Sequence, residues 1–169
     1  MAAVALSETN IRVDDNPSIT VAEMNAKCRR IDNLSLVVVD YLQLMNGSGY
    51  GKGGDSRVNV VSEISRSLKI MAKELNVPVV CLSQLSRGPE SRPDKRPMLS
   101  DLRESGAIEQ DADAVLFLYR DEYYNENSED KGIAECIVSK NRHGEVGTVK
   151  LQWIPQYQTF ADREWKHAE

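Results

Sequence analysis

An apolar run interrupted by one acid, Leu-Val-Val-Val-Asp-Tyr-Leu-Gln-Leu at residues 36–44, constrains the fold of this chain more than any other segment. Valine is β-branched and favours strands, and an apolar run without alternation is typical of a strand buried on both faces of a parallel sheet. Ligands of open α/β sheets bind at the carboxyl ends of the strands, which is where Asp40 lies. A carboxylate at the end of a buried strand costs free energy unless a cation pairs with it. Asp40 is therefore either an acid that holds Mg²⁺ for a bound nucleotide or a residue that caps the following turn.

Composition and charge narrow the class of protein. The chain has 169 residues, of which 41% are hydrophobic and 28% charged, as is typical of one soluble globular domain. It contains no apolar run of the roughly 20 residues that span a bilayer and no visible secretory signal, so we expect a cytoplasmic protein with no membrane contact. The net charge of −5 argues against a chain that coats DNA over its whole surface, but it allows local basic loops. Three dispersed cysteines form no CxxC pair and are expected to be reduced; they are Cys28, Cys81 and Cys136.

Residue patterns predict strands and helices in alternation along most of the chain. Thr20 and Glu23 form a capping box that begins a helix, and apolar residues at three- and four-residue spacing predict a long helix over residues 58–75. The first strand, the first helix and the second strand would form a βαβ unit. In chain order we expect a strand at 11–13, a helix from 20 to about 31, and buried strands at 36–39, 79–82 and 114–119. We expect helical turns, capped by Ser100 and Ser105, between the strands at 79–82 and 114–119. A hairpin of strands at 133–139 and 148–154 and a short strand at 157–160 complete the prediction.

Residues 46–55 are rich in glycine and invite comparison with the phosphate-binding loop GxxxxGK[ST]. Gly51 and Lys52 fit the centre of that motif, but Asn46 replaces its first glycine and Gly53 replaces its metal-binding hydroxyl. We therefore do not expect a phosphate-binding loop here. The segment is either a plain flexible connector or a mobile loop that touches a polyanion. The side chains suited to such a contact are Tyr50, Lys52 and Arg57.

A second long loop, residues 87–97, contains three prolines and one glycine, which rule out a helix or a central strand. Loops longer than about 12 residues are uncommon unless they are functional or disordered. This loop is therefore either a contact to nucleic-acid phosphates or a solvated surface loop. Its cations are Arg87, Arg92, Lys95 and Arg96. An acidic segment farther along completes the set of flexible loops that we expect, at residues 46–57, 87–99 and 120–131.

Four motifs appear in a fixed order: DYLQL at 40–44, LSQLSR at 82–87, SDLRESG at 100–106 and KNR at 140–142. Together they resemble the C-terminal motor domain of the bacterial replicative DNA helicase, the DnaB family, over residues from about 11 to 162. The resemblance implies a RecA-like, three-layer α/β fold with a mostly parallel central sheet and a C-terminal antiparallel hairpin. It also implies an enzyme, a homo-hexameric ring that hydrolyses ATP with Mg²⁺ while it moves along single-stranded DNA, with primase and a helicase loader as partners.

The resemblance implies a role for each matching residue. Asp40 is similar to the Walker B acid that holds Mg²⁺, and Gln84 to the residue that senses the γ-phosphate. Lys140 and Arg142 match a finger that reaches into the neighbouring subunit's site, where fixed cations stabilise the developing phosphoryl charge. Arg103, Glu104 and Gly106 match a loop that contacts DNA. We expect the DNA to pass through the channel of the ring, which Arg103 and the cations of the loop at 87–97 would line. These cations are Arg87, Arg92, Lys95 and Arg96.

One departure from the family pattern concerns the phosphate-binding loop, because no GxxxxGK[ST] occurs in the 169 residues. We therefore expect a single partial RecA-like domain over residues 1–169, with an ordered core at about 11–162, whose central P-loop strand and catalytic Glu lie upstream. Such a piece would expose apolar strand edges and would neither bind nor hydrolyse ATP on its own. The alternatives are another RecA-like ATPase, of the recombinase or clock type, and a non-enzymatic interaction module. The motifs at 101–106 and 140–142 favour the helicase over the other ATPases.

Overall fold

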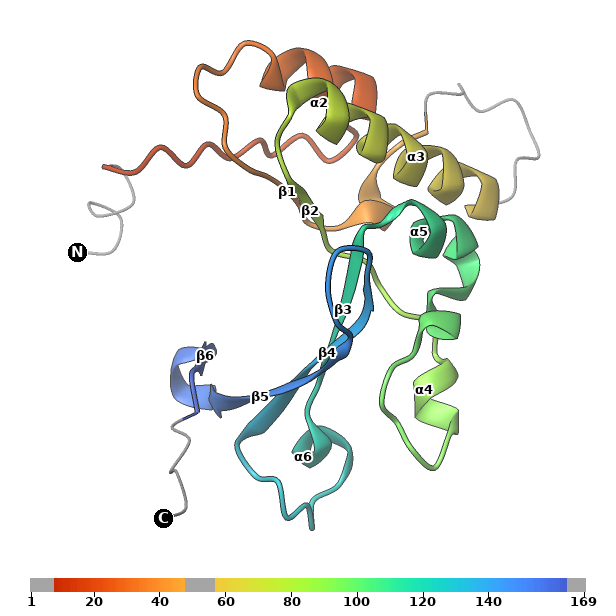
Figure 1. The fold of residues 1–169 in the computed structure, drawn as a ribbon, viewed down its shortest axis with the longest axis vertical. Coiled ribbons are helices and arrows are strands. Elements are labelled where there is room, and N and C mark those ends of the chain that lie inside the picture. Colours follow the sequence, from red (N-terminus) through yellow and green to blue (C-terminus); the bar gives the residue numbers. More distant parts are fainter. Residues whose placement is uncertain (1–7, 48–56, 164–169) are drawn as a thin grey trace.

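The computed structural model describes residues 8–47 and 57–163, without the side chains of residues 103–105. In its N-terminal half, helix α2 (Val21–Cys28) and helix α3 (Arg57–Leu75) pack together beside a small parallel sheet (Figure 1). The sheet consists of β1 (Val37–Val39) and β2 (Val79–Cys81), with Val37 opposite Val79. The parallel pairing confirms what the apolar run at 36–39 predicts.

Local sequence signals account for both helices. Thr20 and Glu23 form the predicted capping box, because Thr20 Oγ1 accepts from Glu23 N and Glu23 Oε2 accepts from Thr20 N. Helix α2 ends at Cys28, about three residues before the predicted end. Helix α3 turns its apolar stripe toward α2 and β1 and contributes half of the buried residues of the core between them. The core residues that α3 contributes are Val61, Ile64, Leu68 and Met71.

The strand predicted at 11–13 is wrong. Ile11 and Val13 belong to no strand and are 66% and 88% exposed. The tendency of such residues to form a strand depends on neighbours that pair with them and cover them, and none does so in the described part of the chain. The expected βαβ unit therefore lacks its first strand.

The C-terminal half forms a second sheet whose four strands are antiparallel neighbours (Figure 1). The hairpin of the second and third strands confirms the prediction, and so does the short last strand. The expected mostly parallel sheet is not found in the described residues, since only β1 and β2 pair in parallel. The order of the second sheet is β3 (Ala114–Tyr119), β4 (Ile133–Asn141), β5 (Gly147–Ile154) and β6 (Thr159–Ala161).

The apolar strands β1, β2 and β3 are buried on one side at most. Val39 is 6% exposed while its neighbour Val38 is 59% exposed, and in β3 the buried Phe117 lies between the exposed Leu116 and Leu118. The prediction of strands buried on both faces is therefore wrong for the described residues. An apolar run records the tendency of side chains to leave water, whereas burial also requires a second layer that covers them.

Short helical turns complete the fold. The exclusion of helix from residues 87–97 is wrong for one turn, since Pro89 occupies the first turn of α4, where its missing N–H costs no hydrogen bond. Ser100 does not cap the next turn, because η2 begins after Met98, whose N–H donates to Asp101. These turns are η1 (Leu42–Leu44), α4 (Gly88–Ser91), η2 (Leu99–Ser105), α5 (Gly106–Asp111), α6 (Asp121–Tyr124) and η3 (Pro155–Tyr157).

Three other expectations concern loops, cysteines and membranes. The flexibility predicted for 87–99 and 120–131 stays a prediction, and most of 46–57, with Tyr50 and Lys52, lies outside the described residues. The three cysteines are free, and burial raises the pKa of the Cys81 thiol to about 11. Within residues 8–47 and 57–163, no helix has the length and apolar character needed to cross a membrane.

Candidate functional site

Polar side chains follow both parallel strands at the edge where the strands end. Asp40 comes directly after β1 and Gln84 follows β2, so the parallel pairing places both at one edge of the sheet. Gln43 joins the two segments, because its amide donates to Ser83 Oγ at 3.0 Å and accepts from Gln84 N at 3.1 Å. This bridge holds the two strand ends together and leaves the side chains of Asp40 and Gln84 exposed.

The Asp40 carboxylate is free of hydrogen bonds to the described residues. The interpretation of Asp40 as a cap is wrong, since η1 begins after Tyr41 and has no side-chain cap. One exposed carboxylate suits Mg²⁺, which keeps several waters and is commonly bound by one or two carboxylates together with substrate phosphates. The described residues contain no cluster of three or more His, Cys, Asp or Glu side chains that could hold a metal ion without such a substrate.

A cavity of about 930 Å³ opens beside Gln84, between the end of β2 and the antiparallel sheet. The Arg120 guanidinium lies 4.6 Å from the ring centre of Trp153, whose buried indole Nε1 has no hydrogen-bond partner among the described atoms. Stacked arginine and aromatic groups offer flat surfaces to a planar ring, and Gln84 adds an amide at the wall. The aromatic residues that line the cavity are Tyr119, Tyr123, Tyr124, Trp153 and Phe160.

Lys140 and Arg142 lie away from this cavity. Lys140 is opposite Val115 near the start of β3, whereas the cavity is lined by residues at the end of that strand. Both cations instead donate to backbone carbonyls at the C-terminal end of α5, where a helix leaves its last acceptors unsatisfied. These carbonyls belong to Glu109, Gln110 and Ala112.

Asp113 holds Arg142 from a second direction. Its backbone carbonyl accepts from Arg142 N at 2.8 Å, and its carboxylate lies 3.7 Å from Arg142 Nε. The Lys69 ammonium of α3 donates to the same carboxylate and thereby lowers the pKa of Asp113, with a smaller contribution from Arg142. The two cations are thus held by one helix end and one half-exposed acid, and no buried acid among the described residues fixes them.

The segment predicted to contact DNA lies where η2 ends and α5 begins. Gly106 is exposed, and a Cβ added to it would meet no atom within 4 Å. Arg103 and Glu104 belong to the last turn of η2, and their side chains are outside the described part. This segment therefore adjoins the N-terminal end of α5, whose C-terminal end holds Lys140 and Arg142.

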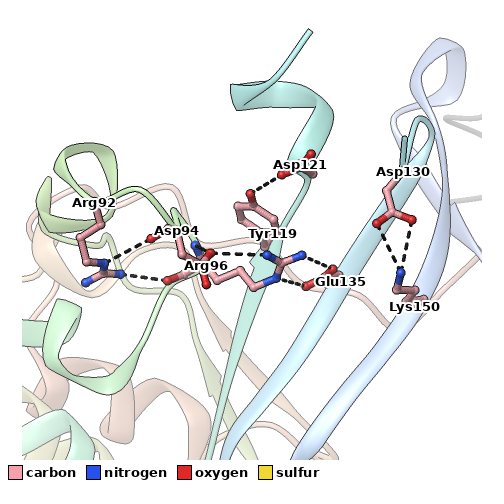
Figure 2. A network of polar contacts seen from close by, with 8 residues as sticks. All are labelled: Arg92, Asp94, Arg96, Tyr119, Asp121, Asp130, Glu135 and Lys150. Atoms are coloured by element: carbon pink, nitrogen blue, oxygen red, sulfur yellow. Dashed lines mark hydrogen bonds and ion pairs between the residues drawn. The ribbon is translucent and has the colours of Figure 1, made fainter. Parts of the chain in front are cut away.

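Two of the four cations in the basic loop are paired with acids. Arg92 makes a bidentate ion pair with Asp101, at N–O distances of 2.7 and 2.8 Å. Arg96 makes a second bidentate pair with Glu135 of β4, at 2.8 Å for both contacts, and its guanidinium lies 4.8 Å from the ring centre of Tyr119 (Figure 2). Hydrogen bonds from the charged guanidinium groups to the acids raise the pKa of both arginines.

The other two cations have no acid partner in the described residues. Lys95 donates to the Glu90 carbonyl at 2.8 Å, and the exposed Arg87 side chain makes no hydrogen bond or ion pair there. Sequence reasoning missed the acids that pair with Arg92 and Arg96. A signal existed for Glu135, since an acid inside an apolar strand requires a cationic partner. The aromatic cavity was missed because residues 120–131 have the composition of a solvated segment.

Exposed polar groups at the carboxyl ends of neighbouring parallel strands are the arrangement at which open α/β domains bind their ligands, so the chain has the site of a ligand-binding α/β domain. Comparison with known families agrees with this class. The DnaB-like helicase C terminal domain matches residues 1–162, and the chain belongs to this family. The resemblance predicted from the four sequence motifs is confirmed.

Two relatives show how much of a longer protein the chain represents. The replicative DNA helicase DnaB of Geobacillus stearothermophilus is 56% identical over 172 residues, which cover 100% of this chain and 37% of the relative. The replicative DNA helicase DnaC of Bacillus subtilis (strain 168) is 55% identical over 167 residues, which cover 97% and 36%. The chain thus spans about a third of the length of these relatives.

Solved structures confirm the fold. A DnaB-like replicative helicase, whose structure was described together with its interactions with primase, superposes with a TM-score of 0.89 at 49% identity, over 96% of this chain and 40% of the other. A separately solved ATPase domain gives the same TM-score and identity over 96% of this chain and 58% of the other. The mixed architecture of a small parallel sheet and an antiparallel sheet is therefore that of the DnaB ATPase domain.

Proposed function

We propose that this chain is the C-terminal part of an ATP-driven replicative helicase motor that unwinds duplex DNA by moving along single-stranded DNA. The observation that carries the proposal is the placement of Asp40 and Gln84 at one edge of the parallel sheet, both exposed. Exposed groups at strand ends are available to a ligand, whereas a structural acid would be expected to have a partner within the chain.

In this proposal Asp40 supplies one oxygen ligand to Mg²⁺, which neutralises the charge of the ATP phosphates when it is bound. Gln84 directs its amide at the terminal phosphate from the neighbouring strand end. The cavity beside Gln84 is large enough for the body of a nucleotide, and Arg120 and Trp153 in its lining suit a planar base.

Lys140 and Arg142 act in trans in the proposed homo-hexamer. They lie toward the start of β3, while the cavity lies toward its end, so they are poorly placed to reach their own chain's nucleotide. A finger supplied by the next subunit stabilises the transition-state charge and couples hydrolysis to the arrangement of the ring. Both cations are held only by backbone carbonyls and one half-exposed acid, which leaves them able to exchange partners.

The DNA-contacting groups in this proposal are Arg103, Glu104 and Gly106, together with the basic loop. Phosphate contacts of this kind position a strand without reading its bases, which suits a motor that moves along any sequence. Among the loop cations, Arg87 and Lys95 have no acid partner in the described residues and are the more available. Primase and a loader are proposed as partners, and the cytoplasm as the location.

The chain by itself is expected to be inactive, because it carries no GxxxxGK[ST] motif. The exposed faces of β1, β2 and β3 support the view that further parts of the longer protein cover them. Val38, Val80, Leu116 and Leu118 are each about half exposed or more. ATP hydrolysis by the purified chain that disappears with Asp40→Asn would contradict this expectation.

The test of the function uses the full-length helicase. Asp40→Asn should lower ATP hydrolysis and unwinding at least about a hundredfold, because one phosphate-bound cation loses its carboxylate. The matched control is Asp32→Asn, an exposed acid away from the strand ends, which should leave both rates near the wild-type values. Equal rates for the wild type and Asp40→Asn would remove Asp40 from the site.

A further inference from the structure

Asp101, 3% exposed, is the least exposed acid in the described part of the chain. Each of its carboxylate oxygens accepts from Arg92, and Oδ2 also accepts from the Met98 backbone N–H at 2.8 Å. A Cβ on Gly88 would lie 2.9 Å from Asp101 Oδ1, so the close approach of the loop requires a glycine at that position. The basic loop and the start of η2 together enclose this carboxylate.

The backbone of Asp101 links three parts of the proposed site. Its carbonyl accepts from Ser86 N at 3.0 Å, and Ser86 lies two residues beyond Gln84. The next residue, Leu102, is buried against Val115 and Phe117 of β3. The proposed DNA segment at 103–106 follows directly. Asp101 therefore ties the strand end that carries Gln84 to the basic loop and to the DNA segment.

Arg96 fixes the other end of the basic loop (Figure 2). Its guanidinium binds Glu135 of β4, while its carbonyl accepts from Arg92 Nη2 at 2.8 Å. The two arginine pairs are therefore one connected network. The loop is attached to η2 through Arg92 and to the antiparallel sheet through Arg96.

An arginine that grips a carboxylate with both terminal nitrogens has few donors left for a phosphate. Movement of Arg92 to DNA would also leave Asp101 charged, buried and without a partner, which is costly. We propose that Asp101 and Arg92 are positioning residues that hold residues 103–106 in the orientation that binds DNA, and that Arg92 is not itself a phosphate contact. This inference rests on the proposed function and revises the role of one cation in it.

The two roles of Arg92 predict opposite effects of Asp101→Asn on the full-length hexamer. If Arg92 contacted phosphates, removal of its acid would free it and strengthen DNA binding. A positioning pair predicts about tenfold weaker binding of single-stranded oligonucleotides. The slope of log affinity against log salt should stay unchanged, because every cation that binds a phosphate remains in place. Fluorescence anisotropy of labelled oligonucleotides across a salt series measures both quantities.

Arg92→Lys is the second variant, and it distinguishes the two roles of Arg92 if Asp101→Asn fails to fold. Lysine keeps the charge but does not make the bidentate grip, so a phosphate contact would tolerate it and a positioning pair would not. We expect its affinity to fall about as far as that of Asp101→Asn. The double variant should bind no more weakly than either single variant, since all three break the same pair. Hexamer mass and circular dichroism melting identify variants that fold.

The matched control is Arg87→Ala, which removes a cation of the same loop that has no acid partner in the described residues. It should lower the salt slope by about one unit for each phosphate that is no longer neutralised, whereas Arg92→Lys should not. Stronger binding by Asp101→Asn, or unchanged binding by both Asp101→Asn and Arg92→Lys, overturns the positioning role. Arg103→Ala separates the two proposals. If it weakens binding while the pair variants do not, only the positioning role fails; if it changes neither affinity nor slope, the DNA segment is wrong and both fail.

Discussion

Two regions of this molecule are rich in cations, and their surroundings differ. In the basic loop, Arg92 and Arg96 each grip an acid that is almost fully buried. At the end of β4, Lys140 and Arg142 contact backbone carbonyls at a helix end, and the acid beside them, Asp113, is half exposed. The charge of a loop therefore does not show whether the loop binds another molecule. The position of the nearest carboxylate decides whether a cation is held within its own chain (committed) or can bind another molecule (available).

The difference has a simple energetic origin. A buried carboxylate cannot be solvated by water, so it holds its arginine for as long as the chain is folded. An exposed carboxylate or a helix-end carbonyl exchanges its partner with water at little cost. We therefore expect the cations at the end of β4 to act on other molecules and the paired arginines to act on their own chain.

The largest expected effect concerns Arg142. In the proposed ring of the full-length protein, Arg142→Ala should lower ATP hydrolysis by about 10³-fold or more, because the proposed finger acts on the transition state, and should leave nucleotide binding nearly intact. Steady-state hydrolysis and equilibrium binding of a nucleotide measure the two effects. The control is Arg66→Ala, an exposed arginine on α3, which should alter neither.

Mixed rings test whether the finger acts in trans. Arg142→Ala subunits combined with subunits that have a defective phosphate-binding loop should recover some hydrolysis at mixed interfaces. If mixed rings form and stay inactive, the trans assignment fails. The difference between the two regions would then concern structure alone and not function.

The second effect is on stability, and it should separate the two regions clearly. Arg96→Ala leaves Glu135 buried without its partner and should lower the local free energy of unfolding by about 3 kcal/mol. Lys140→Ala removes only hydrogen bonds to backbone carbonyls and leaves no buried acid unpaired, so it should cost less than about 1 kcal/mol. Hydrogen exchange of the β4 amides in the full-length protein measures both. Equal costs would remove the distinction between committed and available cations.

A third, smaller effect concerns Arg103, whose substitution tests the proposed contact with DNA. Arg103→Ala should weaken binding of all single-stranded sequences about equally and lower the salt slope by about one unit for each phosphate that is no longer neutralised. In the proposed homo-hexamer several copies would touch one strand, so the change in slope is expected to exceed one. Anisotropy with oligonucleotides of different composition tests this, and weakening confined to one sequence would count against phosphate contact.

The smallest effect is a pH dependence. The hydrogen bonds from Arg92, and then the Met98 N–H, lower the pKa of Asp101 below its ordinary value of 3.8. The contribution of this acid to stability is therefore complete above about pH 4 and is lost as the pH falls through the lower, folded-state value. The wild type should melt a few degrees above Asp101→Asn at pH 7. This difference should shrink toward pH 3. A difference that grows on acidification would contradict the assignment.

Signals carried by neighbouring residues were enough to predict a large part of this molecule. The capping box of Thr20 and Glu23, the apolar stripe of residues 57–75 and the hairpin of β4 and β5 involve contacts between residues close in the chain, so periodicity and turn chemistry reveal them. The parallel pairing also followed from the apolar run that ends at Asp40, and four short motifs were enough to indicate the family.

Only the tertiary structure decided which side of each strand is covered and which cations are free. Leu116 and Phe117 are both apolar neighbours in β3, yet one is exposed and the other buried, because a second layer lies on one side only. Arg92 and Asp101 are nine residues apart, and Arg96 and Glu135 are 39 apart. Pairs of this kind depend on how helices, loops and sheets pack after folding, and buried acids far along the chain thereby turn cations that look available in the sequence into parts of the scaffold.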